Sequence, residues 1–236
     1  MDEEILLSLT SSINKLGTSL RIQSERLFEF ENMMTKDVND AITNLENSFE
    51  SVLETSHSAD DCLRKLKNLK KQNNIFRFLN IIRNTRHHSS SKLPFALTKN
   101  ILSGENSGEI YRHSISIDEQ INNPPSIIPL EITKYFEITS DYVKQGRYKQ
   151  EHMDAILEEL NLENFNKSIN ENGLQVVLDM SPILIASTHY LFNIIKQNNL
   201  NLKLLDDADT YFSYFTSMKS LKLLKPKIYL SKESQN

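Results

Sequence analysis

The residues best suited to chemistry in this sequence are six histidines, one cysteine and a short run of aspartates. A helical zinc site needs two histidines four residues apart, and no pair of histidines in the chain has that spacing. Asp206-Asp207-Ala208-Asp209 resembles the start of a calcium loop but lacks the glycine and the terminal glutamate, which favours helix capping. We therefore predict no metal site, no cofactor and no catalytic residue.

The single cysteine, Cys62, excludes a disulfide framework and a site built from several thiolates. No histidine lies close to it in the sequence in a way that would activate the thiol, so we expect it to pack in the interior. The chain also lacks the Walker, G-x-G-x-x-G and G-x-S-x-G motifs. These observations predict a protein that is not an enzyme.

The elements that would position any site begin with a strong apolar pattern in the first fifty residues. Apolar residues recur there at alternating steps of three and four, which is a heptad seam typical of a coiled coil, with one irregular step at Val38. Gln23 falls on the seam, where a polar residue usually sets the register, and Gly17 weakens a helix by about 1 kcal/mol relative to alanine. The predicted partner-binding residues are Leu6, Leu9, Ile13, Leu16, Leu20, Leu27, Phe30, Met34, Val38, Ile42, Leu45, Phe49 and Val52.

The length of this seam predicts how it is covered. As one continuous helix, residues 6–52 would span about 70 Å, whereas the next expected helix, from about residue 59 to residue 86, would span about 40 Å. A hairpin of the two would leave much of the seam in water, so we expect helices of other subunits to cover the remainder. The alternative interpretation is an ordinary long helix inside a bundle, because long helices depend mainly on tertiary packing.

Four regions follow from composition. Residues 1–86 form a predicted coiled-coil and helical-hairpin assembly region, and residues 87–126, rich in Ser, Gly, Asn and Pro, form a predicted linker that is partly disordered. Residues 127–230 are predicted to be a bundle of short antiparallel helices, followed by a tail at 231–236.

The fold class that these regions predict is all-α: a long N-terminal coiled-coil helix and hairpin, then a small antiparallel helical bundle. Only five glycines are present, which argues against a β-rich fold. Pro129 suits the first turn of a helix. Val176-Val177-Leu178 has the composition of a strand, but a lone strand has nothing to pair with, so we expect helix there as well.

Charge is distributed unevenly along the chain. Residues 1–61 hold 13 acidic and 4 basic side chains, whereas residues 62–99 hold 10 basic and no acidic ones. The basic stretch either balances the acidic helix within the chain, meets an acidic partner subunit, or faces an anionic membrane or nucleic acid. The net charge of −4 gives no general reason to expect a specific nucleic-acid partner. The predicted basic patch consists of Arg64, Lys65, Lys67, Lys70 and Lys71.

Two stretches carry a resemblance to a known family. Lys65-Leu66-Lys67-Asn68-Leu69 through Phe78-Leu79-Asn80-Ile81-Ile82-Arg83, and Glu131-Ile132-Thr133-Lys134-Tyr135-Phe136 through Asp141-Tyr142-Val143-Lys144-Gln145-Gly146, are spaced like helices of vesicle-tethering subunits. The chain thus resembles subunits of the exocyst and conserved oligomeric Golgi complexes. The resemblance implies a non-enzymatic structural subunit in Golgi or secretory traffic, joined to other helical subunits through its N-terminal coil.

The sequence also predicts where the protein is located in the cell and what other function it could have. The acidic N-terminus and the lack of a long apolar run favour a cytoplasmic protein, peripheral to the Golgi or other endomembranes in the tethering interpretation. Peripheral membrane association through the basic stretch stays open. A kinetochore or transcription-scaffold subunit is the alternative function, because such subunits also combine coils with loops.

Overall fold

The computed structural model describes six stretches of the chain, and helices dominate them. The predicted all-α fold class is confirmed in its main part, because helices make up most of the described residues and form the long N-terminal region, and one small sheet departs from it. The greater part of the predicted linker, from residue 89 onward, and the end of the tail, from residue 233, lie outside the described residues. The described residues are 3–66, 73–88, 129–131, 139–160, 174–218 and 228–232.

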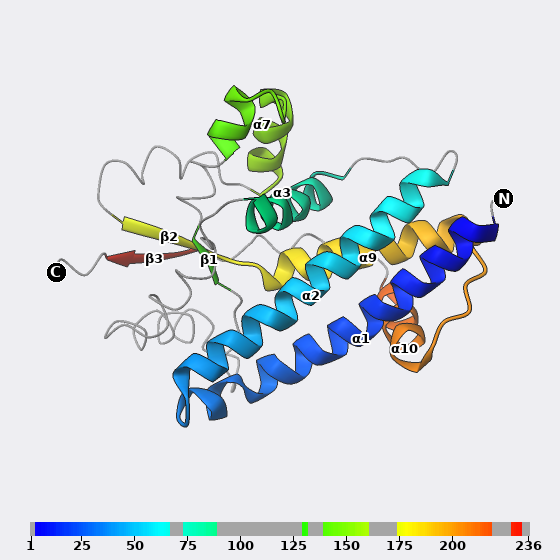
Figure 1. Ribbon diagram of the computed structural model, residues 1–236, viewed down its shortest axis with the longest axis horizontal. Helices are drawn as coiled ribbons and strands as arrows, with labels where there is room; N and C mark the ends of the chain where they lie inside the picture. Colours follow the sequence, from blue (N-terminus) through cyan, green and yellow to red (C-terminus); the bar gives the residue numbers. More distant parts are fainter. Residues whose placement is uncertain are drawn as a thin grey trace.

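The N-terminal region is a hairpin of two long antiparallel helices, α1 (Glu3–Met34) and α2 (Val38–Lys65) (Figure 1). The prediction of one continuous rod is wrong, because the chain turns between them. Asp37 has an extended backbone and caps α2, with its side chain accepting a hydrogen bond from the backbone N–H of Asp40 at 3.0 Å. The turn falls beside the irregular step in the seam, so the break in the heptad pattern marks a reversal of the chain.

Five further helical segments among the described residues pack on the hairpin or on one another. Helix α3 (Asn74–His88) packs against α2 and against α7 (Gln150–Glu159), which follows a short helical segment at 139–144. Helix α9 (Ser181–Gln197) packs against α3 and α10, and α10 (Asp206–Ser217) also lies on α1. The hairpin is therefore flanked by short helices from distant parts of the sequence (Figure 1).

A small antiparallel sheet lies beside these helices, with strand order β1-β2-β3. Its strands are β1 (Pro129–Glu131), β2 (Leu174–Asp179) and β3 (Ile228–Lys232). The predicted helices at 176–178 and at Pro129 are wrong there, because β2 finds two partners. Leu130 of β1 pairs with Leu178, and both side chains are buried. Their packing shows why this β-prone sequence becomes a strand once distant segments supply neighbours.

One hydrophobic core joins the hairpin to the C-terminal elements. Among the described residues, the hairpin and the elements after residue 126 therefore share a core. The clearest joint is at Gly17, where a Cβ atom would lie 2.4 Å from the Cα atom of Ala208 in α10. Only glycine lets the two helices approach this closely, so the residue that weakens α1 on its own makes the crossing with α10 possible.

Candidate functional site

The seam residues lie inside the chain. Nine of the thirteen predicted partner-binding residues are buried, and Leu6, Leu27, Met34 and Val38 are half-buried. Because the chain turns at residues 35–37, the half of the seam on α1 faces the half on α2, and each covers the other. The seam is consequently the core of an intramolecular hairpin and not an assembly surface, as the bundle interpretation had it. The nine buried members are Leu9, Ile13, Leu16, Leu20, Phe30, Ile42, Leu45, Phe49 and Val52.

The basic patch is described only in part. Arg64 forms an ion pair with Asp60 one turn earlier in α2 and lies 3.9 Å from Asp61. Lys65 is exposed at the end of the same helix. The charge of Arg64 is therefore balanced within the chain, by carboxylates of its own helix and not by carboxylates of α1. The other three members, Lys67, Lys70 and Lys71, lie outside the described residues.

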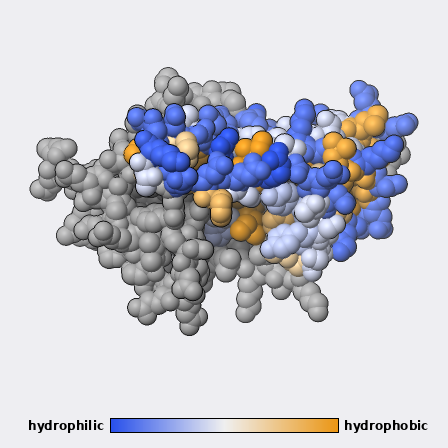
Figure 2. Space-filling model, turned by 90° about the horizontal axis from the view of Figure 1, so that it is seen from below, coloured by the Kyte–Doolittle hydropathy of each residue, from blue (hydrophilic) through white to orange (hydrophobic). Residues whose placement is uncertain are grey.

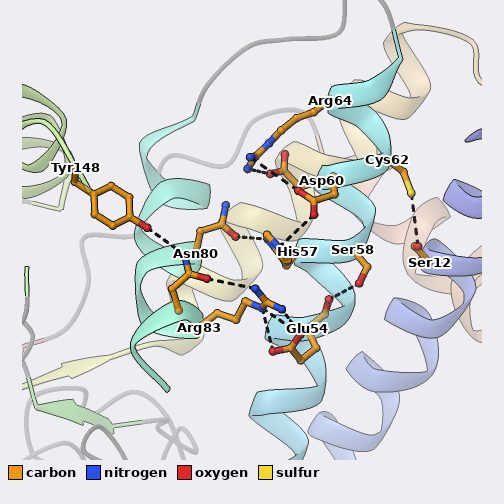
Figure 3. Close-up of polar contacts among 12 residues, drawn as sticks. Ser12, Glu54, His57, Ser58, Asp60, Cys62, Arg64, Asn80, Arg83 and Tyr148 are labelled. Carbon is orange, nitrogen blue, oxygen red and sulfur yellow. Dashed lines mark hydrogen bonds and ion pairs between the residues drawn. The ribbon is translucent and has the colours of Figure 1, made fainter. Parts of the chain in front are cut away.

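Polar side chains join α2 to α3 (Figure 3). Arg83 donates from Nε and Nη2 to the Glu54 carboxylate, each at 3.0 Å. One turn further along α2, His57 Nδ1 donates to Asn80 Oδ1 at 2.8 Å, and His57 Nε2 lies 3.3 Å from Asp61 Oδ2. These contacts hold α3 at a defined distance from α2 and shape the space between the two helices.

A cavity of about 350 Å³ opens beside these contacts, between α2, α3, α7 and α9. Phe76 and Tyr190 form part of its wall, with ring centroids 5.9 Å apart. Burial, and to a smaller extent the charge of Asp60, raises the pKa of the Tyr190 phenol. Of the predicted basic patch, Arg64 lines this space.

A second feature is an apolar surface at the end of the molecule where α1 begins. Leu7 of α1 is 66% exposed and Leu205, in the segment before α10, is 68% exposed. That segment is fastened to α1 through Asn14, which donates to the backbone oxygen of Lys203 at 3.2 Å and accepts from the backbone N–H of Leu205 at 2.8 Å. Figure 2 shows apolar side chains gathered at this end. We call the two exposed side chains, Leu7 and Leu205, the leucine patch; their half-buried neighbours in the sequence, Leu6, Leu202 and Leu204, pack against the hydrophobic core.

The reactive side chains do not gather into a catalytic arrangement in the described part of the chain. Cys62 is buried, and its Sγ lies 3.3 Å from Ser8 Oγ across the hairpin. No group of three or more histidine, cysteine or acidic side chains is close enough to hold a metal among the described residues. No helix within those residues is both long and apolar enough to cross a membrane.

Sequence reasoning did not single out the leucine patch or the cavity. Leu7 lies beside the seam and not on it, which was a usable signal that its side chain points away from the hairpin core. No such signal exists for Leu205, whose position depends on Asn14.

No family model matches the chain, and neither a curated protein nor a solved structure matches it. The resemblance to tethering-complex subunits therefore stays a prediction.

Proposed function

We propose that this chain is a non-enzymatic structural subunit of a larger protein assembly, and that a helix of another subunit docks on the leucine patch. The observation that carries the proposal is that Leu7 and Leu205, from two different elements, are both about two-thirds exposed. Burying a leucine side chain stabilises a complex by about 1.5–3 kcal/mol, so the pair offers a driving force for association. The seam cannot supply it, because α1 and α2 already cover it.

Charge around the leucine patch indicates the chemistry of the partner. Glu3 and Glu4 are exposed one turn before Leu7, and Asp206 and Asp209 are exposed after Leu205. Lys203 is exposed on the same segment, so the carboxylates outnumber the ammonium groups. A partner helix that presents leucine-like residues flanked by Lys or Arg would match both properties of this surface.

The context that we propose is vesicle tethering at the Golgi or another endomembrane, on the cytoplasmic side. Its support is the resemblance in apolar spacing to subunits of tethering complexes. Helical subunits of such complexes associate through helices, which agrees with docking on a helical end. In this proposal the chain joins its complex through the outer surface of the hairpin, since the inner surface is occupied.

The docking proposal is tested with the double variant Leu7→Asp/Leu205→Asp in the tagged, full-length chain. We expect the partner that co-purifies with the wild-type chain to be lost, because two carboxylates would have to be buried against apolar side chains. Tyr214→Asp is the matched control, because Tyr214 is 57% exposed on α10 and lies outside the patch. If the double variant keeps the same partner as the control, or if the wild-type chain purifies alone as a monomer, the proposal is wrong.

The cellular context is tested separately. Identification of the captured partner and fractionation of membranes would show whether it is a subunit of a tethering complex. Capture of subunits from a kinetochore or a transcription complex would overturn the tethering context and leave the docking surface intact. We also expect added salt to weaken binding, because carboxylates at the rim of the patch attract a basic partner.

A further inference from the structure

The cavity between α2, α3, α7 and α9 has the volume of a small-molecule site. Its volume is about 350 Å³, and known ligand pockets occupy about 300–1,000 Å³. All four helices contribute to its wall, with His57 from α2, Arg77 from α3, Ile156 from α7 and Leu191 from α9. The space is thus a product of the tertiary structure and lies apart from the leucine patch.

The charged side chains that line this cavity do not all offset one another. Arg64 is paired with Asp60, and both line the wall, so these two charges offset each other. Arg77 also lines it and is half-buried. Its Nη1 donates to Asn74 Oδ1 at 3.2 Å, and no carboxylate of the described residues lies within ion-pair distance of it. The cavity therefore holds one guanidinium whose charge is not balanced by a described neighbour.

Neutral hydrogen-bond donors surround the same space. Asn73 Oδ1 accepts from the backbone N–H of Ile75 at 2.7 Å, and no described residue accepts from the NH₂ end of that amide, which can donate to a ligand. The Tyr148 hydroxyl accepts from Asn84 Nδ2 at 3.1 Å, and its own proton has no acceptor among the described residues. These donors suit an anionic ligand, because a carboxylate only accepts hydrogen bonds.

The remaining wall is apolar and aromatic. The rings of Phe76 and Tyr190 stand tilted at 50° with their centroids 5.9 Å apart, and Ile156 and Leu191 are buried beside them. A flat apolar body would contact the rings, while a single negative charge would face Arg77. A guanidinium binds a carboxylate through two parallel hydrogen bonds, and one unbalanced positive charge matches one negative charge.

We propose that this cavity binds a small aromatic carboxylate, with Arg77 holding the carboxylate group. The proposal is independent of the docking function, since neither Arg77 nor the cavity wall belongs to the leucine patch. It assigns a ligand-binding role and no reaction. Its chemistry requires the ligand to bind as the anion, so a neutral ligand of the same shape must bind more weakly.

The test uses naphthoate and its neutral isostere naphthamide as probes with the full-length chain. The chain contains no tryptophan, so probe fluorescence is measured without interference from that side chain. We expect naphthoate to bind about tenfold more tightly than naphthamide, because only the anion gains the charged hydrogen bonds. Arg77→Gln should abolish this preference. The matched control is Arg26→Gln, which removes an exposed arginine that pairs with Glu29 on α1.

If circular dichroism shows that Arg77→Gln disturbs the fold, two further variants test the proposal in its place. Arg77→Lys retains the charge and should retain a reduced preference for naphthoate. Ile194→Phe, at a position that lines the cavity, should fill the space and weaken both probes equally. Equal affinity of the two probes for the wild-type chain, a preference that survives in Arg77→Gln, or no binding at millimolar concentration would each overturn the proposal. Loss of binding in Leu7→Asp/Leu205→Asp would also overturn it, because the probes would then occupy the leucine patch.

Discussion

The hairpin of α1 and α2 and the sheet of β1, β2 and β3 obtain their packing partners in opposite ways. In the hairpin, the partner of each seam residue lies on the next helix, beyond a turn of three residues. In the sheet, β2 pairs with segments that lie far before and far after it in the chain. The comparison teaches that a local pattern is sufficient for the hairpin, whereas the sheet, the crossing of α1 with α10 and the cavity depend on contacts between distant segments.

The largest expected effect breaks the hairpin itself. Phe49 is fully buried between the two helices, so Phe49→Ala should lower the free energy of unfolding by about 3–5 kcal/mol. The matched control is Phe28→Ala, because Phe28 is 89% exposed on α1 and its removal should change stability by less than about 0.5 kcal/mol. Urea denaturation followed by circular dichroism measures both. Similar losses for the two variants would mean that α1 and α2 do not pack as described here.

The next largest effect on stability is expected at the crossing of α1 with α10, a contact between segments far apart in the chain. Gly17→Ala should raise the helix propensity of α1 and yet destabilise the protein by about 1–3 kcal/mol, because the new methyl group would collide with the backbone of α10. Hydrogen exchange should show lost protection in α10 and little change in α2. Thr18→Ala, at the exposed neighbouring position, is the control and should leave α10 protected. A more stable Gly17→Ala variant would contradict the close crossing.

A smaller effect, of opposite sign, is expected inside the hairpin. Gln23 is buried, and neither polar atom of its amide has a hydrogen-bond partner among the described residues. Gln23→Leu should therefore stabilise the chain by about 1–2 kcal/mol, because it removes the cost of burying an unpaired amide. Asn47→Leu, at an exposed position on α2, is the control and should not stabilise. A destabilised Gln23→Leu variant would indicate that a buried water completes the hydrogen bonds of this amide.

The smallest effect concerns the cavity and appears only at high pH. Burial and then the charge of Asp60 raise the pKa of Tyr190 above its ordinary value of 10.0. Below that value the phenol is neutral in both the folded and the unfolded chain, so its contribution to stability is fully present. Above it the unfolded chain loses the proton first, and stability falls as pH rises through the folded pKa. Tyr190→Phe should therefore show a shallower loss of unfolding free energy above about pH 10. The same loss in both proteins would show that Tyr190 titrates alike in the two states.

The sequence was most informative where partners are close along the chain. The heptad spacing predicted helix and an apolar face over residues 6–52, and the irregular step beside Val38 lies at the place where the chain turns. It did not show that the step is a turn, because the same irregularity is compatible with a continuous coiled coil. The difference rests on Asp37, whose cap begins a new helix and brings the two halves of the seam together.

Sequence patterns could not predict the cavity or the leucine patch. Arg77 lies in a basic stretch, and nothing in its neighbours distinguishes it from Arg64 or Lys65 until α2, α3, α7 and α9 enclose it. Leu205 lies in a short connection whose exposure depends on the hydrogen bonds of Asn14, 191 residues earlier in the chain. Patterns with a period of a few residues record which face of an element is apolar, and they contain no information on which distant element that face meets.

The sequence by itself determined that this protein is mainly helical, that its first fifty residues carry an amphipathic helical pattern, and that its acidic and basic charges lie in separate stretches. Those properties depend on spacing and composition, which act over one or two turns of a helix. The tertiary structure alone decided that the seam is internal, that Val176-Val177-Leu178 is a strand, and that Gly17 serves a helix crossing. Each of those outcomes depends on the free energy of contacts between segments far apart in the chain, and such contacts exist only once the chain has folded.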